Sequence, residues 1–264
     1  MSQAVDTVLH TEIAGWLAQR ATWAKGASVG FVPTMGALHE GHASLLRRAR
    51  AENDFVVLSV FVNPTQFNDA RDLDAYPRTL RADVGIAREA GVDAVIAPPE
   101  AALYPQGYRY RVSEGEDAKC LEGAHRPGHF DGMLTIVLKL LGIARARRAY
   151  FGEKDFQQLR LVQGLAREFF LETEIVPVET VRESDGLAMS SRNVRLSPEQ
   201  RTLAPYLYTV LRSAPTPHDA VARLAARGFA VDYVEEKWGR RLAAANPAFF
   251  DVNGFGPPRG RPTY

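Results

Sequence analysis

The sequence predicts an α/β fold in which a parallel sheet with helices on both faces is followed by a smaller α+β domain. Short runs rich in β-branched residues alternate with segments whose apolar residues recur at helical spacing, between about residue 28 and residue 178. After about Thr180 the pattern changes, and a Gly- and Ser-containing loop leads into a region interrupted by prolines. Strands that alternate with helices are joined by right-handed crossovers, so the first part is expected to be a Rossmann-like, doubly wound parallel sheet.

Each expected element follows from its own pattern. The expected strands of the first part span residues 28–32, 55–62, 94–97, 149–151 and 174–178, and the expected helices span residues 42–52, 80–90, 133–141 and 156–169. In the smaller part, a helix is expected to start at Pro198 with its apolar face at Tyr206, Leu207, Val210 and Leu211, followed by a helix over 220–226 and a strand over 229–234. The predicted domains are residues 1–180 and 181–264, and residues 246–264 are expected to form a loose, Gly- and Pro-rich tail.

Composition narrows the class of protein. The chain has 264 residues, 46% of them hydrophobic and 24% charged, which is typical of a globular protein. The formal net charge of +1 argues against a broad nucleic-acid-binding surface. The single cysteine, Cys120, excludes an intrachain disulfide and fits a reducing compartment. With no signal pattern and no apolar stretch long enough to span a bilayer, we expect a soluble cytoplasmic protein without a membrane partner.

Two histidines mark the turn between the first expected strand and the first expected helix. His39 and His42 follow a glycine-containing turn, where backbone amides and the helix N-terminus favour an anion. Imidazoles at such a turn can bind phosphate oxygens and stabilise developing charge. The alternatives are a capping histidine beside a surface one, or a metal pair, although the spacing differs from that of the His-Glu-x-x-His zinc motif.

Two further segments carry groups suited to phosphate chemistry. Ser190, Ser191 and Arg192 lie on the interdomain loop and offer the donors that a leaving pyrophosphate needs, but a flexible hinge with an exposed arginine is also possible. Lys154 and Asp155 lie between a strand and a helix. The lysine is a mobile cation suited to a triphosphate, whereas the aspartate is equally a good helix N-cap.

Several segments, taken together, resemble the pantothenate synthetase family of the nucleotidyltransferase superfamily, with its HIGH-type and KMSKS-type motifs. The segments that carry this resemblance are residues 31–46, 59–67, 76–79, 151–159 and 183–193. The resemblance implies an ATP-dependent ligase that joins pantoate to β-alanine through a pantoyl adenylate and releases AMP and pyrophosphate. It also implies a homodimer and a requirement for Mg²⁺. The family's small domain normally continues with further strands after residues 232–235, so here that domain is expected to be incomplete or rearranged.

The resemblance also implies roles for individual residues. The implied catalytic residues are His39, His42, Lys154, Ser190, Ser191 and Arg192. The implied ATP contacts are Pro33, Thr34, Met35, Gly36, His39, His42, Gly152, Lys154, Asp155, Val181, Met189, Ser190, Ser191 and Arg192. The implied pantoate contacts are Met35, Phe61, Gln66, Arg126 and Gln158, and Asp83 is the implied magnesium ligand.

Three rival functions remain open from the sequence alone. An adenylyltransferase that acts on a phosphate acceptor would need a cationic acceptor pocket, whereas the neutral amides of Gln66 and Gln158 favour an acid that carries a carboxylate and hydroxyls. A nucleotide-binding module without catalytic activity would not need both motifs together. A zinc hydrolase would need further spaced ligands beside the two histidines.

Overall fold

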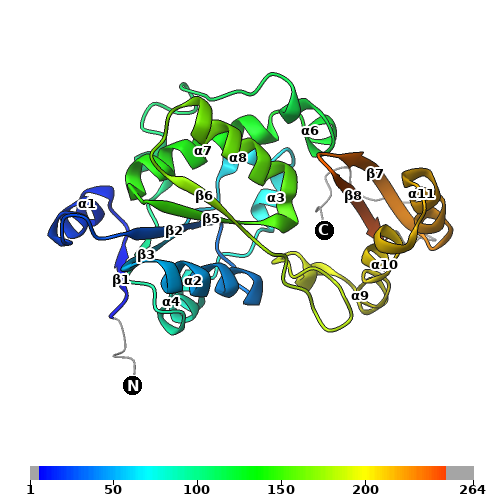
Figure 1. The fold of residues 1–264 in the computed structure, drawn as a ribbon, viewed down its shortest axis with the longest axis horizontal. Coiled ribbons are helices and arrows are strands. Elements are labelled where there is room, and N and C mark those ends of the chain that lie inside the picture. The colour runs from blue at the N-terminus through cyan, green and yellow to red at the C-terminus, as the bar shows by residue number, and fades with distance from the viewer. Residues whose placement is uncertain (1–5, 248–264) are drawn as a thin grey trace.

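Six parallel strands form the main sheet of the structure, a computed structural model that describes residues 6–247 (Figure 1). The strands are β1 (Val8–His10), β2 (Val29–Thr34), β3 (Phe55–Val60), β4 (Ala94–Ile96), β5 (Arg148–Gly152) and β6 (Glu174–Val178), in the spatial order β1-β4-β3-β2-β5-β6. From β2 the chain builds outward through β3 and β4, and then returns to place β5 on the other side of β2. This reversal between β2 and β5 is the switch point at which open α/β sheets bind ligands.

Helices cover both faces of this sheet, which confirms the predicted fold class (Figure 1). The helices α2 (Glu40–Glu52) and α4 (Leu80–Glu89) pack on one face. The other face is covered by α1 (Ile13–Thr22), α7 (His129–Ala144) and α8 (Phe156–Glu168). Because helices lie on both faces, the central strands are apolar along their length, as parallel strands commonly are.

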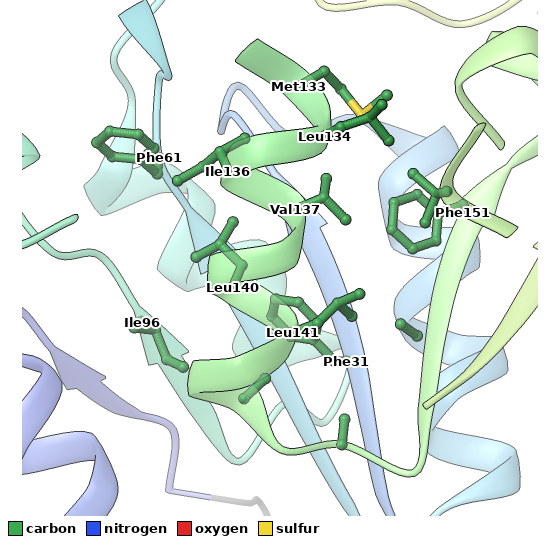
Figure 2. Packing of buried hydrophobic residues seen from close by; sticks show 14 of the residues in the cluster. Phe31, Phe61, Ile96, Met133, Leu134, Ile136, Val137, Leu140, Leu141 and Phe151 are labelled. Atoms are coloured by element: carbon green, nitrogen blue, oxygen red, sulfur yellow. The ribbon is translucent and has the colours of Figure 1, made fainter. Parts of the chain in front are cut away.

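The helix α7 is the core of its face, as Figure 2 shows. Its side chains Leu134, Val137 and Leu141 are almost fully buried against the sheet, where they join Phe31 of β2 and Phe151 of β5. The helix extends beyond the predicted residues 133–141 at both ends. The residues of its first turn, 129–132, therefore lie near the carboxyl ends of the strands, where His129 and Gly132 contact the turn that carries Gln66.

Short elements lie in the loops that follow β3, β4, β5 and β6. They are α3 (Ala70–Asp74), α5 (Glu100–Leu103), α6 (Glu122–His125), and the 3₁₀ turns η1 (Pro64–Gln66), η2 (Asp117–Lys119), η3 (Glu153–Asp155) and η4 (Asn193–Arg195). Among residues 6–247, no helix is long and apolar enough to cross a membrane.

A second, two-stranded antiparallel sheet forms the smaller part of the structure, to the right in Figure 1. Its strands are β7 (Phe229–Lys237) and β8 (Arg240–Pro247), and its helices are α9 (Pro198–Leu203), α10 (Tyr206–Ser213) and α11 (Pro217–Ala226). This part has its own core, in which Leu207, Val210 and Leu224 pack against Phe229 and Val234.

Several sequence expectations need correction. All five expected strands of the main sheet are present with ends within two residues, but β1 and α1 were not expected. The single helix expected from Pro198 is two helices, because Pro205 lacks an amide hydrogen and interrupts the chain between them. The strand β8 was also not expected, and it includes the first two residues of the predicted tail. The remainder of that tail, residues 248–264, lies outside the described residues.

Candidate active site

Two adjoining cavities lie at the carboxyl ends of the central strands. The inner cavity, of about 210 Å³, is bounded by the ends of β2, β3 and β5 and by the loop before α9. The outer cavity, of about 300 Å³, lies between the main sheet and the small domain, whose strands β7 and β8 form one of its walls. Met35, Gln66, Lys154, Asp155 and Arg192 line both cavities, so the two form one continuous cleft.

Almost all of the predicted site residues converge on the inner cavity. Those that line it are Pro33, Thr34, Met35, His39, His42, Phe61, Gln66, Gly152, Lys154, Asp155, Gln158, Val181, Met189, Ser190, Ser191 and Arg192. Arg126 lines only the outer cavity, and Gly36 and Asp83 line neither. These segments are far apart in the sequence, and the parallel sheet brings them together because parallel strands end at one common edge.

The two histidines cap α2 and line the inner cavity at the same time. The Nδ1 atom of His39 accepts a hydrogen bond from the Gly41 amide at 3.1 Å, and Nδ1 of His42 accepts one from the His39 amide at 3.3 Å. A nitrogen that accepts carries no proton, so the proton of each neutral ring lies on Nε2. Neither Nε2 has a hydrogen-bond partner in the part of the chain that the structure describes, so both are available to a ligand as donors.

Burial keeps both histidines neutral. It is the main reason that the pKa of His39 is lowered to about 4, and the nearby Lys154 ammonium lowers it further. Burial also lowers the pKa of His42 to about 3, with His39 as a second cause. The predicted alternative is therefore correct in that His39 caps the helix, but His42 caps it too and is not a surface residue. Capping does not compete with ligand binding, because it uses Nδ1 and leaves Nε2–H. No group of three His, Cys, Asp or Glu side chains within residues 6–247 could hold a metal ion.

Lys154 and Asp155 form an ion pair at the turn η3 that begins α8. The Lys154 Nζ lies 3.2 Å from Asp155 Oδ1. Asp155 occupies the N-cap position of α8, but its carboxylate makes no capping hydrogen bond, so the predicted capping role is wrong. The side chain instead projects into the cleft and remains 55% exposed. Enclosure in the cleft raises the pKa of Asp155, but Lys154 and, more weakly, Arg192 outweigh it, and the pKa lies below its ordinary value.

Gln66 is held as a hydrogen-bond donor by a buried polar network. Its Oε1 accepts from Asn63 Nδ2 at 3.0 Å, which leaves the Nε2 amide hydrogens on the side of Met35 Sδ, 3.2 Å away. Asn63 is 1% exposed, and its own Oδ1 accepts from Tyr104 Oη at 2.8 Å and from Thr65 Oγ1 at 3.0 Å. The orientation of the Gln66 amide is therefore fixed before any ligand binds.

The backbone of Gln66 is fixed as well. Its carbonyl oxygen accepts from Arg126 Nη2 at 3.1 Å and from His129 Nδ1 at 2.8 Å. Arg126 also pairs with Glu122 at 3.1 Å, so the predicted substrate contact is also a support of the turn η1. The supporting roles of Asn63 and His129 were not predicted, because they depend on contacts between residues 41 and 63 positions apart.

Asp83 is not placed to bind magnesium. It is 1% exposed, and its carboxylate accepts from the Leu38 amide at 2.8 Å, the Ala37 amide at 3.2 Å and Thr79 Oγ1 at 3.2 Å. A Cβ at Gly36, where φ is +80°, would lie 2.9 Å from this carboxylate. The geometry contradicts the predicted metal role. Asp83 instead anchors the turn that leads to His39.

The loop that carries the second motif is docked on the main domain. The hydroxyl of Ser191 lies 3.1 Å from Tyr76 Oη, and Ser190 Oγ accepts from the Arg192 amide at 3.2 Å. The Arg192 side chain is only 13% exposed and lines both cavities. The structure therefore does not have the exposed arginine of the hinge alternative.

The small domain supplies residues that the sequence did not reveal. Tyr233, Arg240 and Arg241 reach the outer cavity from β7 and β8. Arg240 Nη1 pairs with Glu153 Oε2 at 2.9 Å, beside Lys154 and Asp155. Tyr233 lies on the expected strand but had no predicted role, and Arg240 and Arg241 lie on β8, which was not expected.

Comparison with known proteins agrees with this geometry. The family model described as pantoate-beta-alanine ligase matches residues 8–248. The chain is 55% identical over 221 residues to the pantothenate synthetase of Bdellovibrio bacteriovorus, with 84% of this chain and 88% of the relative covered. It is 48% identical over 229 residues to that of Legionella pneumophila strain Corby, with 87% and 91% covered. The crystal structure of pantoate-beta-alanine ligase from Francisella tularensis, complexed with beta-gamma ATP and beta-alanine, has a TM-score of 0.87 at 39% identity, with 91% and 94% covered. The cleft, the family model and these relatives show that the chain belongs to the pantoate-beta-alanine ligase family.

Proposed function

We propose that the protein condenses pantoate with β-alanine to form pantothenate, at the expense of ATP. One observation carries the proposal: phosphate-binding groups and neutral amide donors converge on one cavity. His39, His42, Lys154 and Arg192, which line this cavity, are assigned to the phosphates, and Gln66, which lines it as well, is assigned to the acid.

The chemistry divides into two displacements. The pantoate carboxylate attacks the α-phosphorus of ATP, so that an acyl–phosphate bond forms and pyrophosphate leaves. The β-alanine nitrogen then attacks the acyl carbon, gives up a proton, and displaces AMP. No protein nucleophile is needed, because a carboxylate is already nucleophilic. The protein contributes position and charge stabilisation.

On the phosphate side, neutral imidazoles and a cation have different tasks. The Nε2–H groups of His39 and His42 donate to phosphate oxygens from fixed positions, because capping of α2 holds both rings. Lys154, at the neighbouring turn, balances the charge of the phosphates. Ser190, Ser191 and Arg192 complete the set of donors to the departing pyrophosphate.

On the acid side, the cavity offers hydrogen bonds without charge. The Gln66 Nε2 amide and Gln158, in the first turn of α8, face the inner cavity beside Met35 and Phe61. Neutral amides can bind the oxygens of pantoate without weakening the nucleophile by full charge pairing. The apolar side chains suit the gem-dimethyl group.

Magnesium is expected to enter with the nucleotide. Mg²⁺ commonly uses phosphate oxygens, waters and at most one or two carboxylates, and when bound it neutralises phosphate charge. Asp83 does not fit as its ligand, since its oxygens are occupied and it faces neither cavity. We therefore assign no protein ligand to the ion.

The geometry argues against a zinc hydrolase more strongly than against an adenylyltransferase. Lys154 and Arg192 are the cations that line the described inner cavity, and we assign both to the phosphates of ATP. Beside Gln66 and Phe61 the described inner cavity offers no further cation to a phosphate acceptor, although Arg126, Arg182, Arg240 and Arg241 line the adjoining outer cavity. A zinc hydrolase lacks a ligand set among residues 6–247.

We further propose a homodimer in the cytoplasm and a domain boundary near Thr180, with no nucleic-acid or membrane partner. The boundary is supported by the end of β6 at Val178 and by the separate core of the small domain. Closure of this domain would keep water away from the mixed anhydride. Sedimentation velocity tests the dimer.

Isotope exchange between pyrophosphate and ATP tests the proposed reaction. Pantoate alone should support this exchange, because the adenylate forms before β-alanine takes part. Exchange that requires β-alanine, or ADP as the product, would contradict the mechanism.

Alanine at the histidines tests the proposed phosphate contacts. His39→Ala and His42→Ala should each lower exchange turnover by roughly 10²–10³-fold, as the loss of one preorganised donor does, while pantoate binding changes less. His218→Ala, on the exposed side of α11 and outside both cavities, is the matched control. Undiminished turnover in the double histidine variant would leave both rings with the capping role alone.

A further inference from the structure

The short helix α3 holds the motif loop through one carboxylate. Asp72 Oδ2 accepts from Arg192 Nη2 at 3.2 Å, and Asp72 Oδ1 accepts from Arg195 Nη1 at 2.7 Å. Arg195 Nη2 also donates to the Ala75 carbonyl at 2.8 Å. The Asp72 side chain is 15% exposed, so this contact is largely shielded from solvent, unlike an ordinary surface ion pair.

The charges of this group do not cancel. One carboxylate faces two guanidinium groups, so Asp72, Arg192 and Arg195 together keep a net charge of about +1. Burial raises the pKa of Asp72, but the two arginines more than compensate, and the carboxyl remains ionised. An anion that arrives in the cleft therefore still meets a positive group.

Only part of the Arg192 guanidinium is used by Asp72. Nη2 donates to the carboxylate, whereas Nε is buried without a hydrogen-bond partner in the described part of the chain. Arg192 also lines both cavities. Since a buried donor without a partner costs free energy, an acceptor is expected from the ligand.

A second contact fixes the residue next to Arg192. Tyr76, which is 5% exposed, bonds Ser191 through its hydroxyl at 3.1 Å, and its ring lies 5.5 Å from the Arg192 guanidinium carbon. The segment from Asp72 to Tyr76 thus fixes two consecutive residues of the loop.

We propose that Asp72 is a positioning residue for adenylate formation: it orients Arg192 toward the phosphates of ATP, and Arg195 supplies the second positive charge that keeps the group cationic. Without the carboxylate, Arg192 would sample other rotamers and would have to be ordered during the reaction. The proposal rests on the proposed function for the identity of the anion. Different results would overturn the two proposals. Wild-type protein without pantoate-dependent exchange would overturn the proposed function, whereas the Asp72 proposal is tested by the effect of its substitution on that exchange.

Pyrophosphate exchange in Asp72→Asn, Arg192→Ala and the double variant tests the proposal. Asp72→Asn should lower exchange turnover by roughly 10- to 100-fold, the cost of a misplaced catalytic group, with the KM for pantoate little changed. In the Arg192→Ala background the same substitution should cost less than about twofold, because Asp72 acts through Arg192. Asp74→Asn, which removes the same charge from an exposed position of α3, is the matched control and should retain full exchange.

Two results would overturn the proposal. An equal loss from Asp72→Asn in both backgrounds would show that the carboxylate acts on the fold independently of Arg192, and full exchange by Asp72→Asn would show that it does not act at all. If Asp72→Asn does not fold, Asp72→Glu supplies the same test, since it keeps the charge but displaces the carboxylate. It should give a smaller loss that again disappears in the Arg192→Ala background.

Discussion

Gly132 is the position at which a single methyl group should displace the acid side of the cleft. It lies in the first turns of α7, against η1. A Cβ at this position would lie 2.3 Å from the Thr65 carbonyl oxygen and 2.8 Å from the Gln66 amide nitrogen. Non-bonded heavy atoms need about 3.5 Å, so Gly132→Ala must separate α7 from η1 by roughly 1 Å.

That separation acts on the groups proposed to bind pantoate. The turn η1 carries Gln66, and the hydrogen bond from Asn63 Nδ2 to the Gly132 carbonyl, at 3.2 Å, crosses the same interface. A displacement of about 1 Å can cost up to about 10²-fold in rate, and overpacking costs about 1–3 kcal/mol of stability. The phosphate side should be spared, because His39 and Lys154 lie on other elements.

The assay is the pantoate dependence of pyrophosphate exchange, with unfolding by urea measured in parallel. Gly132→Ala should raise the KM for pantoate and leave ATP binding to the free enzyme nearly unchanged. Gly142→Ala is the control on the same helix. A Cβ there meets nothing within 4 Å, so this variant should keep its KM and gain up to about 1 kcal/mol from helix propensity. Unchanged KM and stability in Gly132→Ala would refute the reasoning.

Three other predictions follow from the same site. Gln66→Ala and Gln158→Ala should each raise the KM for pantoate by about one to two decades. Gln66→Glu should raise it further, because the new carboxylate repels that of pantoate. Loss of ATP binding instead would place the acid pocket elsewhere. Asp83→Ala should cost about 1–3 kcal/mol of stability without changing the Mg²⁺ concentration needed for exchange, whereas a specific rise in that concentration would restore its predicted metal role. Burial, with Arg126 as a second cause, lowers the pKa of His129 from 6.5 to about 3. The unfolded chain therefore takes up this proton first as the pH falls, and the free energy of unfolding should drop by about 2 kcal/mol between pH 7 and pH 5; His129→Asn should have a shallower dependence, and an identical slope would contradict the assignment.

The main sheet could be predicted because its strands are short apolar runs between helical patterns. The strand Glu174–Val178 was predicted with its observed ends, since its β-branched residues favour a strand and its proline disfavours a helix. β1 was missed because it has three residues and half-exposed side chains, so its pattern is weak until β4 pairs with it. α1 was missed because Trp16 is its one buried residue, so its apolar face is weakly marked. β8 was missed for a related reason: its run of alanines has little strand preference of its own and depends on pairing with β7.

The location of the site could be predicted only for residues that belong to recognisable motifs. Local patterns and resemblance identified groups such as His39 and Lys154, because they lie on turns whose residue types are themselves informative. Patterns and resemblance did not predict roles that depend on which side chains are buried and which groups they hydrogen-bond in the folded chain. Asp155 has the sequence position of a cap but bonds Lys154, and Asp83 has the chemistry of a metal ligand but is buried under the turn it anchors. Asn63 and Asp72 act on Gln66 and Arg192 through side-chain contacts that no spacing in the sequence displays.

The histidine pair shows why fold and chemistry are difficult to separate in this cleft. A helix N-terminus needs acceptors for its first amides, and an imidazole meets that need with Nδ1 only while it is neutral. Burial lowers the pKa of both rings far enough to keep them neutral, so the cap persists. The same two conditions place the remaining proton on Nε2 and aim it at the cavity. The requirements of the helix therefore determine the tautomer on which the proposed phosphate binding depends, and the proposed donors are in position before a nucleotide binds.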